Sequence, residues 1–407
     1  MIISGESSGE LYGSLLAKTL KMRNPSIEIT GVGGEKMESA GVRLISKISS
    51  AFGATEAIKK YNEIRNTFKS VISVLMSFKP QVLVLIDYPD FNIRVAKEAK
   101  KLGIKILYYV SPQIWAWRKG RIKVIGRLVD MMAVILPFEE EIYRQAGISS
   151  EFVGHPAVDE IREVISEVRG QKTEDRRQEL EGKNSDIEIS LEFKLKVREE
   201  LGLIADRPVM TLMPGSRTHE IKKLLPVMHD VIMEMKGKYP DYQFVMPIAP
   251  NLPEEEVKKI RGWEDKKYQL LVLKGQSVKT LLASDLAVIA SGTSTLQAAL
   301  LGIPMTVVYR LSPLTYCIGK LIVKVKHIAL VNVILDNSFK NDAGIRVKEL
   351  LQKDVCKENI MNEICRIIND MEYRNNMLSQ FKKVREFFLD KNASLRVAEM
   401  VEEMAYN

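Results

Sequence analysis

A buried apolar run that ends in small residues and an arginine is the first candidate for chemistry. Val209–Met213 predicts a strand, which Pro214-Gly215 breaks before Ser216 and Arg217 open a helix. The backbone N–H groups at the start of such a helix bind anions, and Ser216 is placed to cap them. Arg217 adds a planar cation that pairs with phosphate through two hydrogen bonds.

A second junction of this kind follows later in the chain. The strand Leu286–Ala290 runs into Ser291-Gly292-Thr293-Ser294-Thr295. Two phosphate-suited turns in one domain suggest a diphosphate ligand. The alternative is that both are ordinary strand-to-helix turns, in which Gly, Ser and Thr serve the backbone conformation alone.

A carboxylate ends a third apolar strand. Val82–Ile86 is followed directly by Asp87, and Asp90 comes three residues later. The carboxyl ends of parallel strands line the ligand crevice of open α/β sheets, so Asp87 is a candidate general base for a sugar hydroxyl. Partial burial would raise its proton affinity. The alternative is a helix cap, a role that suits Asp90 better than Asp87.

Two loops near the start of the chain carry further polar and aromatic groups. Gly5-Glu6-Ser7-Ser8-Gly9-Glu10 matches the serine-hydrolase pattern G-x-S-x-G around Ser7, but its position and its carboxylates favour sugar hydroxyls instead. The segment from Ser111 to Arg118 places Trp115 and Trp117 beside basic residues, which suits sugars, nucleobases or a membrane interface as well as plain packing.

The elements that must position these groups alternate between strands and helices from end to end. Such alternation is typical of parallel sheets with crossover helices. Strands are predicted at 27–31, 82–86, 104–110 and 131–136 in the first half, and at 209–213, 244–247, 270–273, 286–290 and 305–309 in the second. The fold class is therefore α/β, with two doubly wound domains and a charged linker near 161–196. A helix is expected at 191–201.

Composition narrows the partners without choosing one. The 407 residues carry a formal net charge of +8, which favours phosphorylated ligands, nucleic acid or an anionic membrane surface. A basic amphipathic helix at 56–78 either lies on lipid or covers the sheet. The three cysteines and four isolated histidines have no metal-site spacing, no leader peptide is evident, and no apolar run approaches the roughly 20 residues of a membrane span.

The motifs together resemble the lipid-A-disaccharide synthase family, inverting glycosyltransferases that join two acylated glucosamines. The resemblance covers nearly the whole chain and rests on Gly5 to Glu10, Gly31-Val-Gly-Gly34, Ile86-Asp-Tyr-Pro-Asp-Phe-Asn92, Tyr109 to Arg118, Leu136-Pro-Phe-Glu139, Phe152-Val-Gly-His-Pro156, Met213 to Arg217 with Glu220, Ser291 to Thr295, Tyr309-Arg310 with Pro313 and Thr315, and Glu349-Leu-Leu-Gln352.

The resemblance implies a glycosyltransferase-B fold that needs no metal or cofactor. It implies an acceptor domain at 1–165, a linker and entry helix at 166–200, a UDP-sugar domain at 201–375, and helices at 376–407 that pack back on the first domain or on a partner subunit. The implied donor is UDP-2,3-diacylglucosamine and the implied acceptor is 2,3-diacylglucosamine 1-phosphate (lipid X). A homodimer, attached peripherally to the cytoplasmic face of the inner membrane and binding no nucleic acid, is also implied.

Residue roles follow from the matching motifs. Asp87 and Arg217 match essential positions and Glu6 an active-site position, so these three are the expected catalytic residues. The donor is assigned to Gly215, Ser216, Glu220, Ser291, Gly292, Thr293, Thr295, Gln297, Asn332 and Gln352. The acceptor is assigned to Ser8, Asp90, Ser111 and Trp115.

Two departures from the family pattern stand in the second half. Gln297 replaces a glutamate suited to ribose hydroxyls, and Asn341-Asp342 replaces a Gly-Arg pair. The expected reaction is an inverting displacement in which Asp87 deprotonates the acceptor and Arg217, with the Ser291 turn, stabilises the departing diphosphate. The rivals are another UDP-sugar transferase or epimerase of the same fold, a hydrolase using Ser7, and a basic binding module.

Overall fold

The computed structural model describes most of the chain, in two compact units. The described residues are 1–47, 56–112, 122–171, 187, 189–262, 270–311, 326–339 and 344–406. The side chains of Ser7 and of residues 56–61, Trp115 and Trp117, Asn341-Asp342 and the centre of the charged linker lie outside this part. Unit 1 comprises residues 1–159 and 391–407, and unit 2 comprises residues 160–390.

Unit 1 is built around a parallel sheet whose described strands follow the order β3-β2-β1-β4-β5-β6-β7. The strands are β1 (Ile2–Ser4), β2 (Thr30–Gly33), β3 (Arg43–Lys47), β4 (Val82–Ile86), β5 (Lys105–Tyr109), β6 (Met131–Val134) and β7 (Ser150–Phe152). Its helices are α1 (Ser7–Arg23), α2 (Glu35–Ser39), α3 (Glu56–Phe78), α4 (Pro89–Lys101), α6 (Ile122–Gly126), α7 (Pro137–Gln145) and α19 (Ala393–Tyr406).

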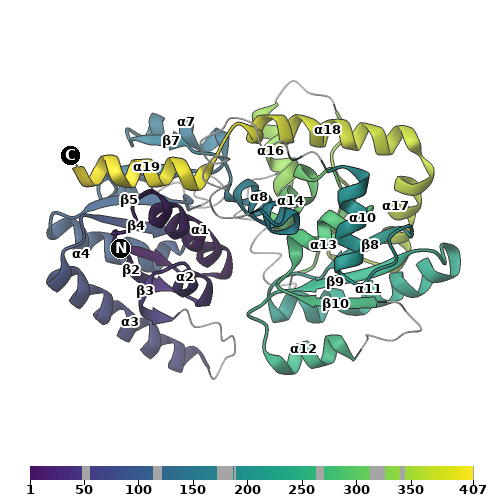
Figure 1. Ribbon diagram of the computed structural model, residues 1–407, viewed down its shortest axis with the longest axis horizontal. Coiled ribbons are helices and arrows are strands. Elements are labelled where there is room, and N and C mark those ends of the chain that lie inside the picture. Colours follow the sequence, from purple (N-terminus) through teal and green to yellow (C-terminus); the bar gives the residue numbers. More distant parts are fainter. Residues whose placement is uncertain are drawn as a thin grey trace. The chain divides into compact units, whose positions relative to one another are not determined.

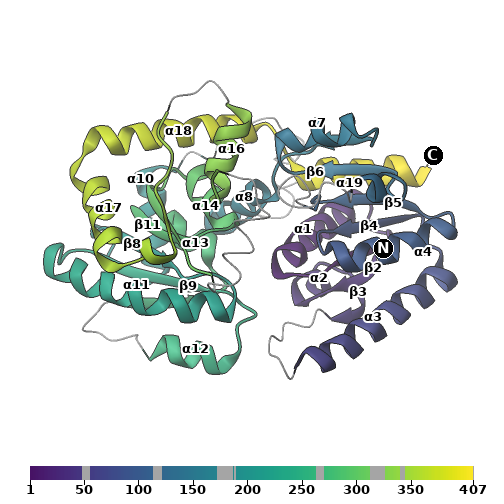
Figure 2. The same ribbon diagram turned by 180° about the vertical axis from the view of Figure 1, so that it is seen from behind.

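Helices cover both faces of this sheet. α1 packs beside α2 and α19 on one face, and α3 packs beside α4 on the other (Figures 1 and 2). β4 is consequently buried along its whole length, which explains why Val82–Ile86 is a continuous apolar run instead of an alternating one. The last helix closes the unit: Asp159 Oδ2 accepts hydrogen bonds from the backbone N–H and the hydroxyl of Ser394, both at 2.7 Å.

Unit 2 repeats the arrangement, with its described strands in the order β10-β9-β8-β11-β12-β13. The strands are β8 (Val209–Met213), β9 (Gln243–Ile248), β10 (Leu270–Lys274), β11 (Leu286–Ala290), β12 (Met305–Tyr309) and β13 (Glu349–Leu351). The helices are α10 (Leu191–Glu200), α11 (Thr218–Lys238), α12 (Glu254–Arg261), α13 (Ser277–Ala283), α14 (Thr293–Leu300), α16 (Leu330–Ser338), the 3-10 turn η2 (Gln352–Asp354), α17 (Lys357–Asn369) and α18 (Met371–Leu389). α8 (Pro156–Arg169) spans the boundary between the units.

Buried charge ties the entry helix to the second sheet. Asp285, just before β11, accepts from Lys194 Nζ at 2.7 Å and from Arg198 Nη2 at 2.5 Å. The same carboxylate accepts the backbone N–H of Val209, at 2.8 Å. Because this network joins α10, β8 and β11 at the amino ends of the strands, it leaves their carboxyl ends available for ligands.

The α/β class and the two parallel sheets are confirmed. β4, β8, β11 and β12 begin and end at the predicted residues, and β5, β6, β9 and β10 differ by one to two residues. β2 lies at Thr30–Gly33, later than the predicted 27–31, and β1, β3, β7 and β13 were missed because three- to five-residue strands carry little periodicity.

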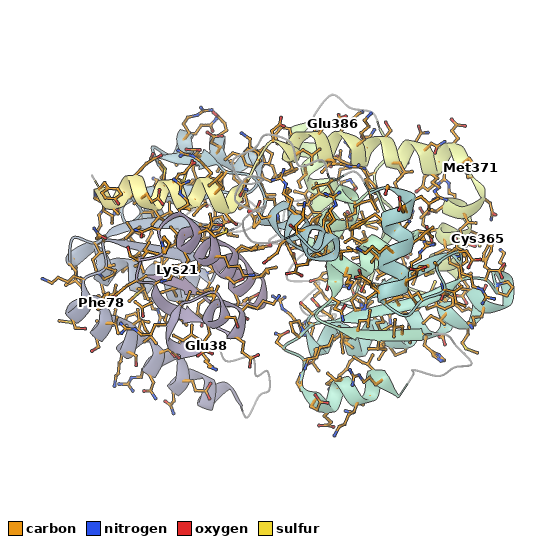
Figure 3. The ribbon with its side chains drawn as sticks, viewed as in Figure 1. Lys21, Glu38, Phe78, Cys365, Met371 and Glu386 are labelled. Carbon is orange, nitrogen blue, oxygen red and sulfur yellow. The ribbon has the colours of Figure 1, made fainter. Side chains whose placement is uncertain are left out.

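The extent of each unit differs from the expected ranges. The chain leaves unit 1 at Asp159 and returns at Lys391, whereas the sequence suggested 165 and 376. α18, with the exposed Met371 at its start and Glu386 in its last turn, belongs to unit 2, and only α19 returns to unit 1 (Figure 3). No helix within the described residues has the length and apolar composition needed to cross a bilayer.

Candidate active site

The candidate residues gather where each sheet reverses its strand order. In unit 1, β1 and β4 are neighbours although their helices lie on opposite sides of this point, and Glu6 and Asp87 follow these two strands. In unit 2, β8 and β11 occupy the same place, and the Arg217 and Ser291 turns follow them. Ligands of doubly wound sheets bind outside the carboxyl ends of strands at such switch points.

The turn after β4 holds two successive residues in the left-handed region. Asp87 has φ 47° and Tyr88 has φ 46°, although neither is glycine. Each such residue costs on the order of 1–3 kcal/mol, and this strain concentrates at functional sites. α4 has Tyr88 at its N-cap and no side-chain cap, so the prediction that Asp90 caps this helix is wrong; Asp90 lies exposed in the first turn.

The first loop packs directly against this turn. A Cβ on Gly5 would lie 2.1 Å from Cγ of Tyr88, so only glycine allows the approach. Burial, followed by the negative charges of Glu6 and Asp90, raises the pKa of Tyr88. Glu6, Asp87 and Asp90 therefore surround one tyrosine, and the half-buried Ser8 stands in the first turn of the adjoining α1.

The turn after β5 is also strained. Val110 has φ 62°, an outlier for a β-branched residue. Ser111 is 4% exposed, and the neighbouring Pro112 carbonyl accepts a hydrogen bond of 3.2 Å from Tyr143 Oη. Trp115, the remaining acceptor candidate, lies outside the described residues. Unit 1 thus places unusual backbone at two adjacent strand ends.

The turn after β8 is closed by a carboxylate. Glu220 Oε2 accepts the backbone N–H of Ser216 at 3.2 Å and of Arg217 at 3.3 Å. The prediction that Ser216 caps α11 is wrong, because the N-cap residue is Arg217 and Glu220 supplies the capping oxygen from the next turn. Gly215, at φ 106°, is needed here, since a Cβ would lie 2.5 Å from that oxygen.

The Arg217 side chain lies on the exposed side of this turn. Burial and the nearby Glu220 raise the pKa of Tyr309, at the end of β12, and Arg217 lowers it. Arg217, Glu220 and Tyr309 therefore interact electrostatically at one edge of the sheet. Because Glu220 already engages two of the amides, the arginine and the neighbouring turn remain as the anion-binding groups of this edge.

The turn after β11 presents a helix start built from small residues. Ser291 Oγ donates to Ile328 O at 2.8 Å, and Thr295 Oγ1 donates to Gly292 O at 2.8 Å. Gly292 is exposed and Thr293 is half-buried, so the start of α14 is open on one side. The amides of such a helix start carry partial positive charge, which suits a phosphate.

Asn332 and Gln352, placed near the nucleotide by resemblance, differ in setting. Asn332 is fully buried: its Nδ2 donates to Val347 O at 2.9 Å and to Glu349 Oε1 at 2.8 Å, and its Oδ1 accepts from Val347 N. Asn332 therefore holds the chain in place around β13. Gln352 has φ 54° at the end of β13, and Arg310 Nε donates to its carbonyl at 3.4 Å.

Gln297 has a carboxylate partner. It lies 5% exposed on α14, and its Nε2 donates to Glu160 Oε2 at 2.5 Å. The sequence alone gave no sign of Glu160, which comes from α8. The position that departs from the family pattern therefore still has an acidic oxygen beside it, supplied by another helix.

Other residues of the site were also missed from the sequence. Asn92 and Tyr108 are fully buried and bond to the backbone of the Asp87 turn, and Glu349 accepts the amides of Ile328 and Ala329. A polar residue on the apolar face of α4 was the available signal for Asn92. Among the described residues, no cluster of three or more His, Cys, Asp or Glu side chains is arranged to hold a metal ion.

The two edges differ in the charge that they can handle. Unit 1 gathers the carboxylates of Glu6, Asp87 and Asp90, which accept protons and bind hydroxyls. Unit 2 gathers Arg217 and the start of α14, which stabilise an anion. Together these groups suit a transfer in which one ligand loses a proton and another departs with negative charge.

Comparison with known proteins agrees with this chemistry. Residues 1–180 and 185–400 match the family model described as lipid-A-disaccharide synthetase. The chain is 36% identical over 407 residues to the lipid-A-disaccharide synthase of Geobacter sulfurreducens, covering 99% of this chain and 96% of that one. It is 34% identical over 409 residues to the synthase of Coxiella burnetii, covering 100% and 98% of the two chains.

Solved structures share the fold at low sequence identity. UDP-GlcNAc 2-epimerase from Neisseria meningitidis, bound to UDP-GlcNAc, is 12% identical with a TM-score of 0.63 and covers 99% of both chains. The glycosyltransferase of kitacinnamycin is 12% identical with a TM-score of 0.57, covering 99% of this chain and 98% of that one. The two-domain architecture is that of glycosyltransferases of the B type and of these epimerases.

Proposed function

We propose how this chain, which belongs to the lipid-A-disaccharide synthetase family, transfers its sugar. It is a glycosyltransferase of lipid A biosynthesis, acting on a UDP-sugar donor and a lipid acceptor to make the lipid A disaccharide. The donor is UDP-2,3-diacylglucosamine, bound by unit 2, and the acceptor is lipid X, bound by unit 1. The products are the acylated disaccharide 1-phosphate and UDP.

The acceptor hydroxyl is activated by Asp87. The carboxylate takes the hydroxyl proton as the acceptor oxygen forms a bond to the anomeric carbon of the donor, on the face opposite UDP. The bond from that carbon to the diphosphate oxygen breaks at the same time, so the configuration inverts. Glu6 and Ser8 bind sugar hydroxyls beside the base, and Asp90 and Ser111 extend this acceptor surface.

The departing diphosphate is stabilised in unit 2. Arg217 and the amides that open α14 at Thr293 oppose the negative charge that grows as the bond breaks, and groups fixed before the reaction need not reorganise. The Gln297 and Glu160 pair offers a donor and an acceptor to the ribose hydroxyls. Glu220 and Asn332 hold the loops from which these groups project.

One observation carries the proposal. The carboxylates of unit 1 and the cation of unit 2 each lie at the switch point of their own sheet, where doubly wound folds bind ligands. A base and an anion site at these two places match the two ends of a glycosyl transfer. No other described strand end combines a carboxylate with the left-handed backbone that Asp87 and Tyr88 share.

Product analysis tests the proposal. The enzyme is supplied with synthetic UDP-2,3-diacylglucosamine and lipid X, and the products are followed by mass spectrometry and by NMR of the new glycosidic bond. We expect one UDP per disaccharide and an inverted anomeric configuration. Retention of configuration, or donor consumption that does not depend on lipid X, would contradict it; the second result would favour an epimerase-like or hydrolytic reaction.

The enzyme also attaches to the anionic cytoplasmic face of the inner membrane, as a homodimer. α3 supports the first point: its Met76 is 60% exposed and its Phe78 is 45% exposed, with Lys69 and Arg65 on the same helix (Figure 3). Sedimentation with anionic vesicles should exceed that with neutral vesicles and should fall for Met76→Ser/Phe78→Ser. Light scattering should give twice the mass of one chain; a monomer would contradict the dimer.

A further inference from the structure

The backbone of Asp87 is held in a conformation that it would not adopt alone. Asp87 and Tyr88 both have φ near +47°. L-residues other than glycine visit this region as single residues, because Cβ crowds the following carbonyl. Two in succession persist only where surrounding contacts over-determine them. The direction of the Asp87 carboxylate depends on this backbone, since a return to extended φ would swing Cβ away.

Two buried side chains converge on one carbonyl oxygen of this turn. Tyr108 Oη donates to Asp87 O at 2.7 Å, and Asn92 Nδ2 donates to the same oxygen at 2.7 Å. Asn92 Nδ2 also donates to Ile86 O at 3.2 Å. Both side chains are fully buried, Tyr108 on β5 and Asn92 on α4, so neither donor has water as a substitute.

Packing closes the turn from the other side. The Tyr88 ring stacks on Phe91, with ring centroids 5.2 Å apart, and Gly5 lies against its Cγ. The Asp87 N–H donates to Tyr109 O at 3.4 Å, which continues the β4 to β5 ladder up to the turn. The left-handed pair is therefore fixed at its carbonyl, its N–H and its ring, by residues of β5, α4 and the first loop.

We propose that Tyr108 and Asn92 are positioning residues, which aim the Asp87 carboxylate by clamping its backbone carbonyl. The inference rests on the proposed function, in which Asp87 is the base. Neither residue touches a substrate: both act on the main chain behind the carboxylate. They set how often Asp87 stands in line with the acceptor hydroxyl, so they influence the rate of the chemical step and leave ligand affinity unchanged.

The test is Tyr108→Phe, which removes one hydroxyl and keeps the ring. We expect kcat to fall about tenfold, with KM for lipid X and Kd for UDP within twofold of the parent. The matched control is Tyr373→Phe, which removes the hydroxyl bond to Glu363 Oε1, a buried bond of 2.5 Å between α17 and α18 of unit 2. This control should lose stability while kcat stays within twofold.

A double mutant separates positioning from general loosening. In the Asp87→Asn background, Tyr108→Phe should change single-turnover formation of the disaccharide by less than twofold, because the group that it aims is gone. An equal tenfold loss in both backgrounds would show that Tyr108 does not act through Asp87 and would overturn the proposal. Full turnover of Tyr108→Phe would also overturn it.

The failures of the two proposals are distinguishable. If Asp87→Asn keeps its activity, the base assignment fails, and the inference falls with it. If Asp87→Asn is inactive and Tyr108→Phe is fully active, only the inference fails. If Tyr108→Phe does not fold, Asn92→Leu takes its place in the same test, since it removes the amide donor and leaves the Tyr108 bond intact.

Discussion

The turn after β4 and the turn after β11 occupy the same place in their sheets and are built in opposite ways. The first carries a carboxylate on a left-handed pair of non-glycine residues, Asp87 and Tyr88. The second, 291–295, has no non-glycine residue with positive φ, and its hydroxyls bond to nearby carbonyls. The first turn is strained and acidic, and the second is relaxed and presents amides.

The difference follows from what each turn does in the proposed reaction. A base must place one carboxylate along one direction, and strain held by buried bonds achieves this at a cost in stability. An anion site needs several N–H groups pointing one way, and an ordinary helix start supplies these without strain. The same contrast explains why the carboxylate of unit 2, Glu220, caps a helix and the carboxylate of unit 1 ends a strand.

Asp87→Asn should have the largest effect. The amide keeps the shape of the side chain but cannot take a proton, so kcat should fall by at least about 10³-fold, within the range of general-base contributions. UDP affinity, measured by calorimetry, should stay within twofold because unit 2 is unchanged. Glu98→Gln, which neutralises an exposed carboxylate on α4, is the control. An active Asp87→Asn would remove the chemical half of the comparison.

Arg217→Ala should come next. Loss of one fixed donor to the leaving group should cost about 3 kcal/mol in the barrier, or on the order of 10²-fold in kcat, and should weaken UDP binding as well. Arg261→Ala, at an exposed arginine that ends α12, serves as the control for removal of a charge. Unchanged UDP affinity and turnover in Arg217→Ala would mean that the anion site of unit 2 lies elsewhere.

Acid should separate the two units, because unit 1 contains a histidine that stays neutral when folded. Burial lowers the pKa of His155 to about 3, and its Nδ1 accepts the Ala157 N–H at 3.0 Å. The unfolded chain protonates this group below about pH 6.5, so the folding free energy is lost by up to about 1.4 kcal/mol per pH unit as pH falls from there towards 3.

His155→Gln should flatten this dependence. Urea unfolding between pH 7.5 and 4.5 should show a shallower slope than in the parent, and hydrogen exchange of the parent at pH 5 should rise first in unit 1. His229→Gln, on α11 of unit 2, is the matched control. Equal slopes for His155→Gln and the parent would mean that this histidine does not set the acid stability of unit 1.

Glu220→Gln should have the smallest effect and sharpen the comparison. A neutral amide oxygen caps the Ser216 and Arg217 amides less strongly, so the free energy of unfolding should fall by about 1 kcal/mol. Turnover should stay within about threefold, because this carboxylate holds a loop and moves no proton. Glu254→Gln, in the first turn of α12, is the control, and a loss of kcat as large as that of Asp87→Asn would contradict the capping role.

The sequence indicated the candidate turns better than their internal bonding. Long apolar runs gave β4, β8, β11 and β12, and the residues that follow them were recognised as chemical because strand ends line ligand sites. The capping assignments for Ser216 and Asp90 failed, because a cap depends on which oxygen reaches the helix start, and here Glu220 reaches it from the next turn. Short strands such as β1 and β7 gave too little periodicity to detect.

Local pattern by itself determined the α/β class, the identity of the charged and small residues at the strand ends, and the family to which the motifs belong. Only the tertiary structure decided which strands are neighbours, and hence that Glu6 lies beside the Asp87 turn, that Glu160 bonds to Gln297, and that Tyr108 and Asn92 share one carbonyl oxygen. These contacts join residues far apart along the chain or on different elements, and strand order and helix packing, which no short segment encodes, bring them together.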